Sequence, residues 1–163
     1  MGRAGVDTSR ISFGEKVAAA SGVALLLFMF LPWYGFGGTS IEVPVSGTIS
    51  TPRADLNAWQ AFSLLDLVLF LVALLAIALA VARAADALPS GLPAPPARIV
   101  LGAGALAVLL VLYRILNVPG PEVEGFENGR KIGIFLALLA SGGIAFGGHT
   151  AMNEHAPTGS RRR

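Results

Sequence analysis

The sequence contains no cysteine. This absence excludes disulfide bonds, thiolate metal sites and thiol redox chemistry. Charged residues are also scarce, at 13% of the 163 residues, whereas soluble domains carry about 25%. Much of the chain therefore has little need of water, and we expect a single-domain integral membrane protein.

Apolar residues, by contrast, make up 54% of the chain. A helix that crosses a bilayer needs about 20 mostly apolar residues. Four segments meet this need and predict transmembrane helices at about residues 13–31, 59–82, 98–118 and 131–149. The predicted fold class is an all-α membrane protein, a four-transmembrane-helix bundle that occupies residues 13–152.

The first apolar segment also has features of a signal peptide, because basic residues precede a short apolar run. However, Pro32, Trp33 and Tyr34 follow it directly, and no Ala-x-Ala cleavage site stands there. Three further apolar segments follow. An uncleaved first helix is therefore the favoured interpretation.

The distribution of Lys and Arg predicts the orientation of the helices. If both termini are cytoplasmic, the outer loops hold only Arg53, Arg130 and Lys131. The cytoplasmic segments then hold Arg3, Arg10, Lys16, Arg83, Arg98, Arg161, Arg162 and Arg163. Residues 1–12 and 153–163 are predicted to be disordered cytoplasmic tails, the second of them basic.

Four aromatic side chains agree with this orientation. Trp33, Tyr34, Trp59 and Tyr113 all fall near the outer ends of predicted helices. Amphipathic rings favour the boundary between lipid and water. We therefore expect these four residues to act as anchors at the outer interface.

The longest loop spans residues 32–58 and lies on the outer side. Its segment SIEVPV alternates polar and apolar residues, and SGTIS follows it. This pattern predicts a small β-hairpin, in which Pro44 would restrict its strand to an edge. The alternative is an irregular loop that only connects two helices.

Two ionisable residues fall within the predicted spans. Asp66 lies roughly 10 Å and Arg114 roughly 6 Å from the outer ends of two consecutive antiparallel helices. Ser63 lies on the same helix face as Asp66, and Asn117 on the same face as Arg114. We predict an intramembrane polar cluster of these four residues, because an unpaired charge in the bilayer costs about 2.5–3.5 kcal/mol.

Two alternatives to a structural pair stay open. Arg114 lies close enough to the interface to extend its guanidinium into water unaided. The pair could also belong to a transport site, although a structural clamp is the favoured interpretation.

Small residues recur at spacings that allow close helix packing in lipid. They are Gly14, Ala18, Gly22, Gly102, Gly143 and Gly147. The GxxxG pair of Gly143 and Gly147 also fits homodimerisation through the fourth helix. Packing within one bundle is the favoured interpretation, since four helices are available.

No catalytic, cofactor-binding or metal site is predicted. Ser141 and His149 lie about 12 Å apart on one helix axis, too far to form a catalytic pair. His149, Glu154 and His155 straddle a helix end and a loose tail, which offers no fixed ligand geometry. The short basic C-terminus fits anionic lipid rather than nucleic acid.

The segments LPWYGF (31–36) and NAWQAFSLLDLVLFL (57–71), with the Ala/Leu-rich run to Arg83, resemble a group of uncharacterised four-helix membrane proteins of high-GC bacteria. This resemblance implies a topology and a bacterial plasma-membrane location, but no activity. The loop lengths are similar to those of claudin-like tetraspan proteins, whose loop disulfide and Gly-Leu-Trp motif are absent here. Small multidrug transporters use a membrane-embedded Glu in their first helix, whereas Glu15 lies at the inner mouth beside Lys16.

The expected function is that of a non-enzymatic structural or accessory subunit. Its outer loop 32–58 would recognise a membrane-protein partner or lipid. The alternative is a small transporter or ligand-binding protein with a polar cavity at Asp66 and Arg114. A closed, dry pair would favour the first, and an open polar pocket the second. In either case we expect function to reside in the outer half of the molecule.

Overall fold

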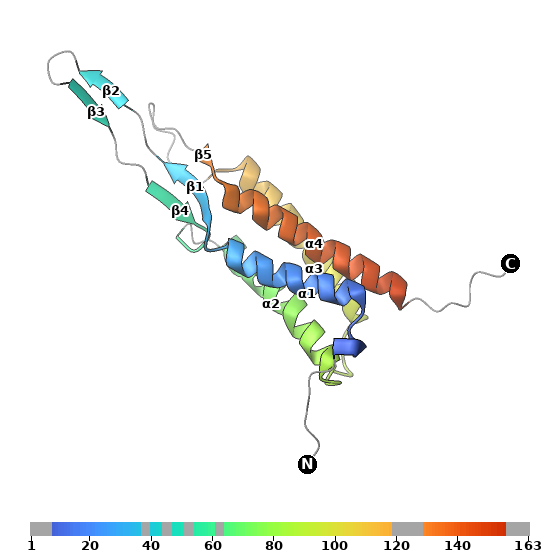
Figure 1. Cartoon of the computed structure of the whole chain (residues 1–163). Helices are drawn as coiled ribbons and strands as arrows, with labels where there is room; N and C mark the ends of the chain where they lie inside the picture. The colour runs from blue at the N-terminus through green and yellow to red at the C-terminus, as the bar shows by residue number, and fades with distance from the viewer. Residues whose placement is uncertain are drawn as a thin grey trace.

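The computed structural model describes residues 8–36, 40–43, 47–50, 54–60, 64–118 and 129–155. The elements are η1 (Thr8–Arg10), α1 (Phe13–Phe28), β1 (Pro32–Phe36), β2 (Ser40–Val43), β3 (Gly47–Ser50), β4 (Ala54–Asn57), α2 (Leu64–Ala84), α3 (Pro96–Leu116), β5 (Gly129–Arg130) and α4 (Ile132–Glu154). The four α-helices lie side by side, and the strands lie at one end of them (Figure 1). We call this the sheet end; the opposite end, where α1 begins and α4 ends, is the terminal end.

The chain is mostly helical, as the sequence predicts. Among the described residues, α2, α3 and α4 are long and apolar enough to cross a membrane. The first helix is shorter than expected, since α1 has 16 residues and ends at Phe28. Met29 to Leu31 form a turn instead, because Pro32 opens a strand directly after them.

Local signals explain where several helices begin and end. Ser12 caps α1, because its side chain accepts from the Glu15 backbone while the Glu15 side chain accepts from the Ser12 backbone. α2 ends where Asp86 adopts a φ of 56°, a left-handed conformation that Asp tolerates better than most residues. α4 continues to Glu154, so Asn153 and Glu154 are helical and not part of a loose tail.

α4 packs closely against α1 on one side and α3 on the other. A Cβ atom added at Gly147 would lie 2.5 Å from the Ala18 nitrogen of α1. A Cβ atom added at Gly148 would lie 2.5 Å from the Leu101 nitrogen of α3. Two consecutive glycines therefore let α4 approach both neighbours at backbone distance.

The sheet at one end was not expected from an all-α class. It has three strands in the order β4-β1-β5, and both neighbours of β1 run antiparallel to it. The hairpin expected in the first outer loop is also present, since β2 pairs with β3 from Ser40↔Ser50 to Val43↔Gly47. Figure 1 shows this hairpin farther from the helices than β1 and β4.

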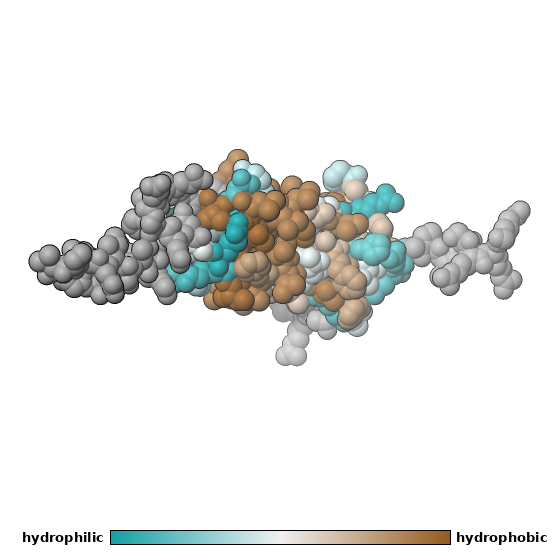
Figure 2. Space-filling view, turned by 90° about the horizontal axis from the view of Figure 1, so that it is seen from above, coloured by the Kyte–Doolittle hydropathy of each residue, from teal (hydrophilic) through white to brown (hydrophobic). Residues whose placement is uncertain are grey.

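The hydrophobic core runs along the inside of the helices and continues into β1. Its largest fully buried side chains are Trp33, Tyr34, Leu25, Met29, Leu69, Ile134, Ile144 and Val111. Many other large apolar side chains point outward, such as Leu64, Leu116 and Leu139. In Figure 2 brown apolar residues cover the middle of the visible face, with hydrophilic residues on both sides of them.

Candidate functional site at the junction of helices and sheet

Asp66 and Arg114 meet inside the protein near the sheet end. Asp66 lies in the first turn of α2 and Arg114 in the last turn of α3. The Arg114 Nη2 donates to Asp66 Oδ2, and the two residues are only 0% and 5% exposed. Each charge also suits its helix end, because an anion is favoured at a helix N-terminus and a cation at a C-terminus.

Of the other two members of the predicted polar cluster, only Asn117 lies within the described residues. Ser63 lies outside the described residues. The Asn117 side chain donates to the Tyr113 carbonyl oxygen of its own helix, at 3.1 Å and on the exposed side. The buried site therefore has Asp66 and Arg114 at its centre without the expected amide.

Tyr34 links this site to the sheet, a role that the sequence did not suggest. Its hydroxyl donates to the carbonyl oxygen of Arg114 at 3.1 Å. The side chain is fully buried, and burial raises the pKa of its phenol even though the nearby Arg114 cation opposes this effect. Tyr34 thus satisfies one of the carbonyl groups that the end of α3 leaves without a helical partner.

A second contact joins the same helix end to β5. The Arg130 Nε donates to the Ile115 carbonyl oxygen, one residue after the carbonyl that Tyr34 binds. The backbone nitrogen of Lys131 then donates to the Trp33 carbonyl oxygen at 2.8 Å. Side chains from β1 and β5 therefore bind adjacent carbonyl groups in the last turn of α3.

An ion pair crosses the middle strand of the sheet. The Lys131 Nζ lies 3.2 Å from Asp55 Oδ1 on β4, and the lysine side chain passes over Gly35 of β1. A Cβ atom at Gly35 would lie only 2.3 Å from the Lys131 Cε. Glycine at this position therefore gives the lysine room to reach its partner.

The four aromatic side chains expected at the outer interface have different surroundings. Trp33 and Tyr34 are fully buried, so their rings pack against protein and are not exposed as interface anchors would be. A bulge between Pro32 and Tyr34 shifts the strand register, and such a bulge re-aims neighbouring side chains. It accounts for the burial of two consecutive aromatic residues, and Trp33 Nε1 finds a partner in the Phe28 carbonyl oxygen at 2.8 Å.

Trp59 and Tyr113 remain nearer the surface. The half-buried Trp59 packs between Phe30 and Phe70, with ring centroids 5.9 and 5.4 Å away. Tyr113 is 54% exposed. Of the four predicted anchors, only these two have rings that could reach lipid.

Of the small residues predicted to pack between helices, all but Gly102 lie at a close helix contact. Gly14, Ala18, Gly143 and Gly147 form the seam between α1 and α4, and a Cβ at Gly143 would lie 2.3 Å from the Ser21 Oγ. Gly22 faces α2, at the Ala73 carbonyl oxygen. Gly102 is an exception, because a Cβ there would meet nothing within 4 Å. In α3 it is the nearby Gly104 that packs against α4.

This use of Gly143 and Gly147 bears on the homodimer alternative. Their close approach is to α1 of the same chain, so the GxxxG face is already covered. The contacts correspond to packing within one molecule. A dimer would need a different surface.

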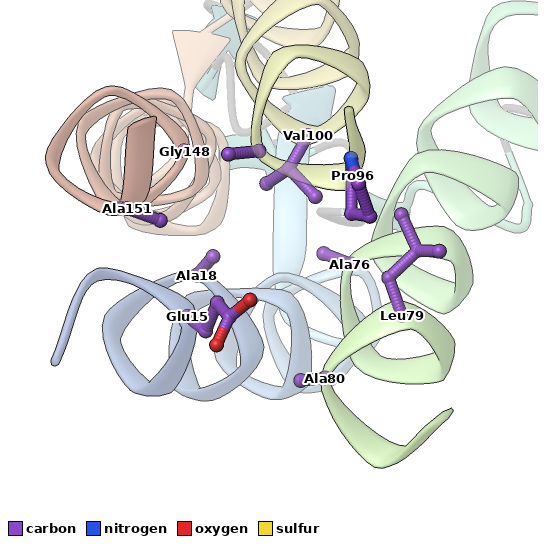
Figure 3. Close-up of a pocket in the computed structure, with 11 residues that line it drawn as sticks. Glu15, Ala18, Ala76, Leu79, Ala80, Pro96, Val100, Gly148 and Ala151 are labelled. Carbon is purple, nitrogen blue, oxygen red and sulfur yellow. The ribbon is translucent and has the colours of Figure 1, made fainter. Parts of the chain in front are cut away.

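A hollow opens at the terminal end, on the side of the molecule where no site was expected. It holds about 290 Å³ of unfilled space, including the part open to the outside, and all four helices line it. Most lining residues are small or apolar, among them Ala18, Ala80, Val100, Gly148 and Ala151. Figure 3 shows the carboxylate of Glu15 directed into this space. Asp66 and Arg114 do not line it.

The polar groups beside this hollow join three helices. The Arg83 Nε lies 3.6 Å from Glu15 Oε1, and Arg83 Nη2 lies 2.5 Å from His155 Nε2. The Glu154 carboxylate accepts from the Gly14 backbone at 3.1 Å. Glu154 lies in the last turn of α4, so this bond joins the start of α1 to the end of α4.

The residues considered for catalysis and metal binding have ordinary partners. The Ser141 hydroxyl donates to the Ala137 carbonyl oxygen at 2.8 Å, and His149 Nε2 lies 3.2 Å from Asn153 Nδ2. Among the described residues, no three His, Asp or Glu side chains gather in a way that could hold a metal ion.

No protein-family model matches the chain, and no curated protein is similar enough to be matched to it.

Proposed function

We propose that the chain is an integral membrane protein, a four-helix bundle that acts as a non-enzymatic structural or accessory subunit. It would hold loop 32–58, which carries strands β1 to β4 and which we call the ribbon, outside the bilayer. There the ribbon would recognise a membrane-protein partner or lipid. The observation that carries this proposal is the closed Asp66–Arg114 pair directly beneath the sheet.

The outward apolar side chains support a membrane location. Leu64, Leu116 and Leu139 are each more than 70% exposed, and a helix that is apolar on all sides is expected either in a large core or in lipid. The apolar zone of Figure 2 lies between two hydrophilic zones, as a bilayer-spanning surface would. Met29 to Leu31 would extend the short α1 through the rest of the bilayer.

The excess of Lys and Arg in the segments at the terminal end supports a cytoplasmic location for that end. The sheet end would then face outward, from the plasma membrane of a bacterial cell. The location of both termini follows from this orientation.

Burial of the ion pair favours an accessory role over transport. A transport site needs a charge that substrate or water can reach, and intramembrane charges of that kind face a polar cavity. Here the Asp66 side chain is 0% exposed and its partner 6% exposed. The pair instead lies directly beneath Tyr34, which supports a role in holding the sheet on the helices.

The orientation can be tested directly, because the chain has no cysteine of its own. Thr48→Cys places a thiol in the hairpin, and Ser90→Cys places one in the connection between α2 and α3. In intact cells, a membrane-impermeant maleimide should label the first and not the second. Labelling of both, or of Ser90→Cys alone, would contradict the proposed topology.

Recognition by the ribbon can be tested with a photoreactive amino acid at position 48 and, as a matched control, at position 90. Irradiation of intact cells should give a discrete cross-linked product from the hairpin position only. An equal pattern from both positions, or no product from either, would contradict a role of the ribbon in binding.

A further inference from the structure

The contact between Arg83 and His155 fixes the protonation state of the histidine. His155 Nδ1 lies 2.7 Å from the Ala151 carbonyl oxygen, and its Nε2 lies 2.5 Å from Arg83 Nη2. A carbonyl oxygen only accepts and a guanidinium only donates. Nδ1 must therefore carry the hydrogen, and Nε2 must be bare. The contact exists only while the imidazole is neutral.

This contact lies beside the hollow, because Arg83 also faces Glu15, which lines it. Arg83 follows Ala80 by three residues and His155 follows Ala151 by four, so each lies one turn beyond a lining residue on the same helix face. Figure 3 shows α2 and α4 on opposite sides of the hollow. The Arg83–His155 contact therefore reaches from one side of the hollow to the other.

Charged groups from two helices face His155, Arg83 from α2 and Glu154 from α4. Glu154 on α4 interacts electrostatically with the ring, and the carbonyl end of α4 favours a cation. Glu15 on α1 offers Arg83 a second partner, since its Oε1 lies 3.6 Å from the Arg83 Nε. Also at the terminal end, Arg10 pairs with Asp86 at 2.8 Å.

We propose that Arg83 and His155 form a proton-sensitive latch beside the hollow. Imidazoles ordinarily gain a proton between pH 5 and 8. A proton on Nε2 places two donors and two positive charges face to face, so the latch opens. Arg83 then turns to Glu15, which leaves α2 tied to α1 while the direct link between α2 and α4 is lost.

A thiol placed in the hollow reports on the latch. In an Ala80→Cys protein, we compare the rate of reaction with a small uncharged methanethiosulfonate from pH 8 to pH 5.5. The reference is the same protein with His155→Gln, which keeps a neutral acceptor at every pH. Taking the ratio of the two rates cancels the pH dependence of the thiol itself.

We expect this ratio to rise about fivefold as the pH falls, which corresponds to loss of about 1 kcal/mol, the ordinary net contribution of one hydrogen bond. His155→Ala should give the raised rate already at pH 8. His149→Gln, a change at the other histidine of the chain, should leave the pH response intact.

Two results would overturn the latch. One is a ratio of the two reaction rates of the thiol at position 80 that stays constant between pH 8 and pH 5.5. The other is a reaction rate of that thiol at pH 8 that is the same with His155→Ala as with His155 in place. Far-UV circular dichroism at each pH checks that the helices remain formed. His155→Gln provides a folded reference even if the alanine variant is unstable.

Discussion

Replacing Arg114 with leucine should strongly destabilise the protein, because it leaves the Asp66 carboxylate buried without its counter-ion. Asp66 is fully buried, and breaking a buried ion pair by removing one partner costs about 3–5 kcal/mol. The bond from Tyr34 should survive, because it is made to the backbone carbonyl of Arg114. The loss of stability in Arg114→Leu therefore measures the charge pair and not the attachment of the sheet.

A double-mutant cycle separates the pair from its surroundings. The double variant Asp66→Leu/Arg114→Leu removes both charges and should recover most of the loss, since a buried pair replaced by apolar residues is often neutral. Arg10→Leu is a matched control at the exposed Arg10–Asp86 pair, where the loss should be at most about 1 kcal/mol.

Thermal unfolding in a mild detergent measures these differences. For a chain of this length, the Arg114→Leu loss corresponds to a fall in Tm on the order of 10 °C. A Tm within error of the unchanged protein would refute the buried pair. A double variant that loses as much as the sum of the single variants would refute the coupling between the two charges.

Three further predictions concern the sheet and the helix seams. Tyr34→Phe should lower the stability by about 1 kcal/mol through loss of its hydrogen bond to α3, whereas Tyr113→Phe should have little effect; melting curves compare the two. In the Tyr113→Phe protein, the absorbance of the remaining phenolate should appear at a midpoint above the ordinary pKa of about 10, because burial raises the pKa of Tyr34. The stability that this phenol contributes is then fully present below about pH 10 and is lost as the pH rises through the folded pKa; a midpoint at or below 10 with intact circular dichroism would contradict its burial. Gly147→Leu should reduce the yield of folded protein because its Cβ would lie 2.5 Å from the Ala18 nitrogen, while Gly102→Leu should not; equal yields by size-exclusion chromatography would contradict the tight seam.

Hydropathy predicted the helices well because long apolar runs have few alternatives. The meeting of Asp66 and Arg114 followed from depth alone, since antiparallel neighbouring helices bring equal depths together. The start of α1 also has a local signal in the sequence, because Ser12 and Glu15 have the spacing of a capping box.

The three-stranded sheet was harder to foresee. Strand β5 has only two residues and pairs with a strand almost 100 residues earlier, so no local pattern indicates it. Trp33 and Tyr34 suggested an interface because aromatic residues beside a span usually lie there. The bulge that buries both of them depends on strand pairing and is invisible in the sequence.

In the apolar helices, the sequence also did not indicate which residues face the neighbouring helices. Gly102 and Gly104 look equivalent in α3, because a helix that is apolar on all sides shows no stripe that marks its packed face. The contact between Arg83 and His155 was missed for another reason. The sequence predicts a fourth helix that ends at about residue 149 and a loose tail from Asn153, whereas α4 continues to Glu154 and brings His155 to α2.

The attachment of the sheet to α3 has a mechanical consequence. Tyr34 and Arg130 come from segments far apart in the chain, yet they bind adjacent carbonyl groups at the end of one helix. As long as both bonds hold, a tilt of α3 must carry β1 and β5 with it, because each strand is tied to the same helix end.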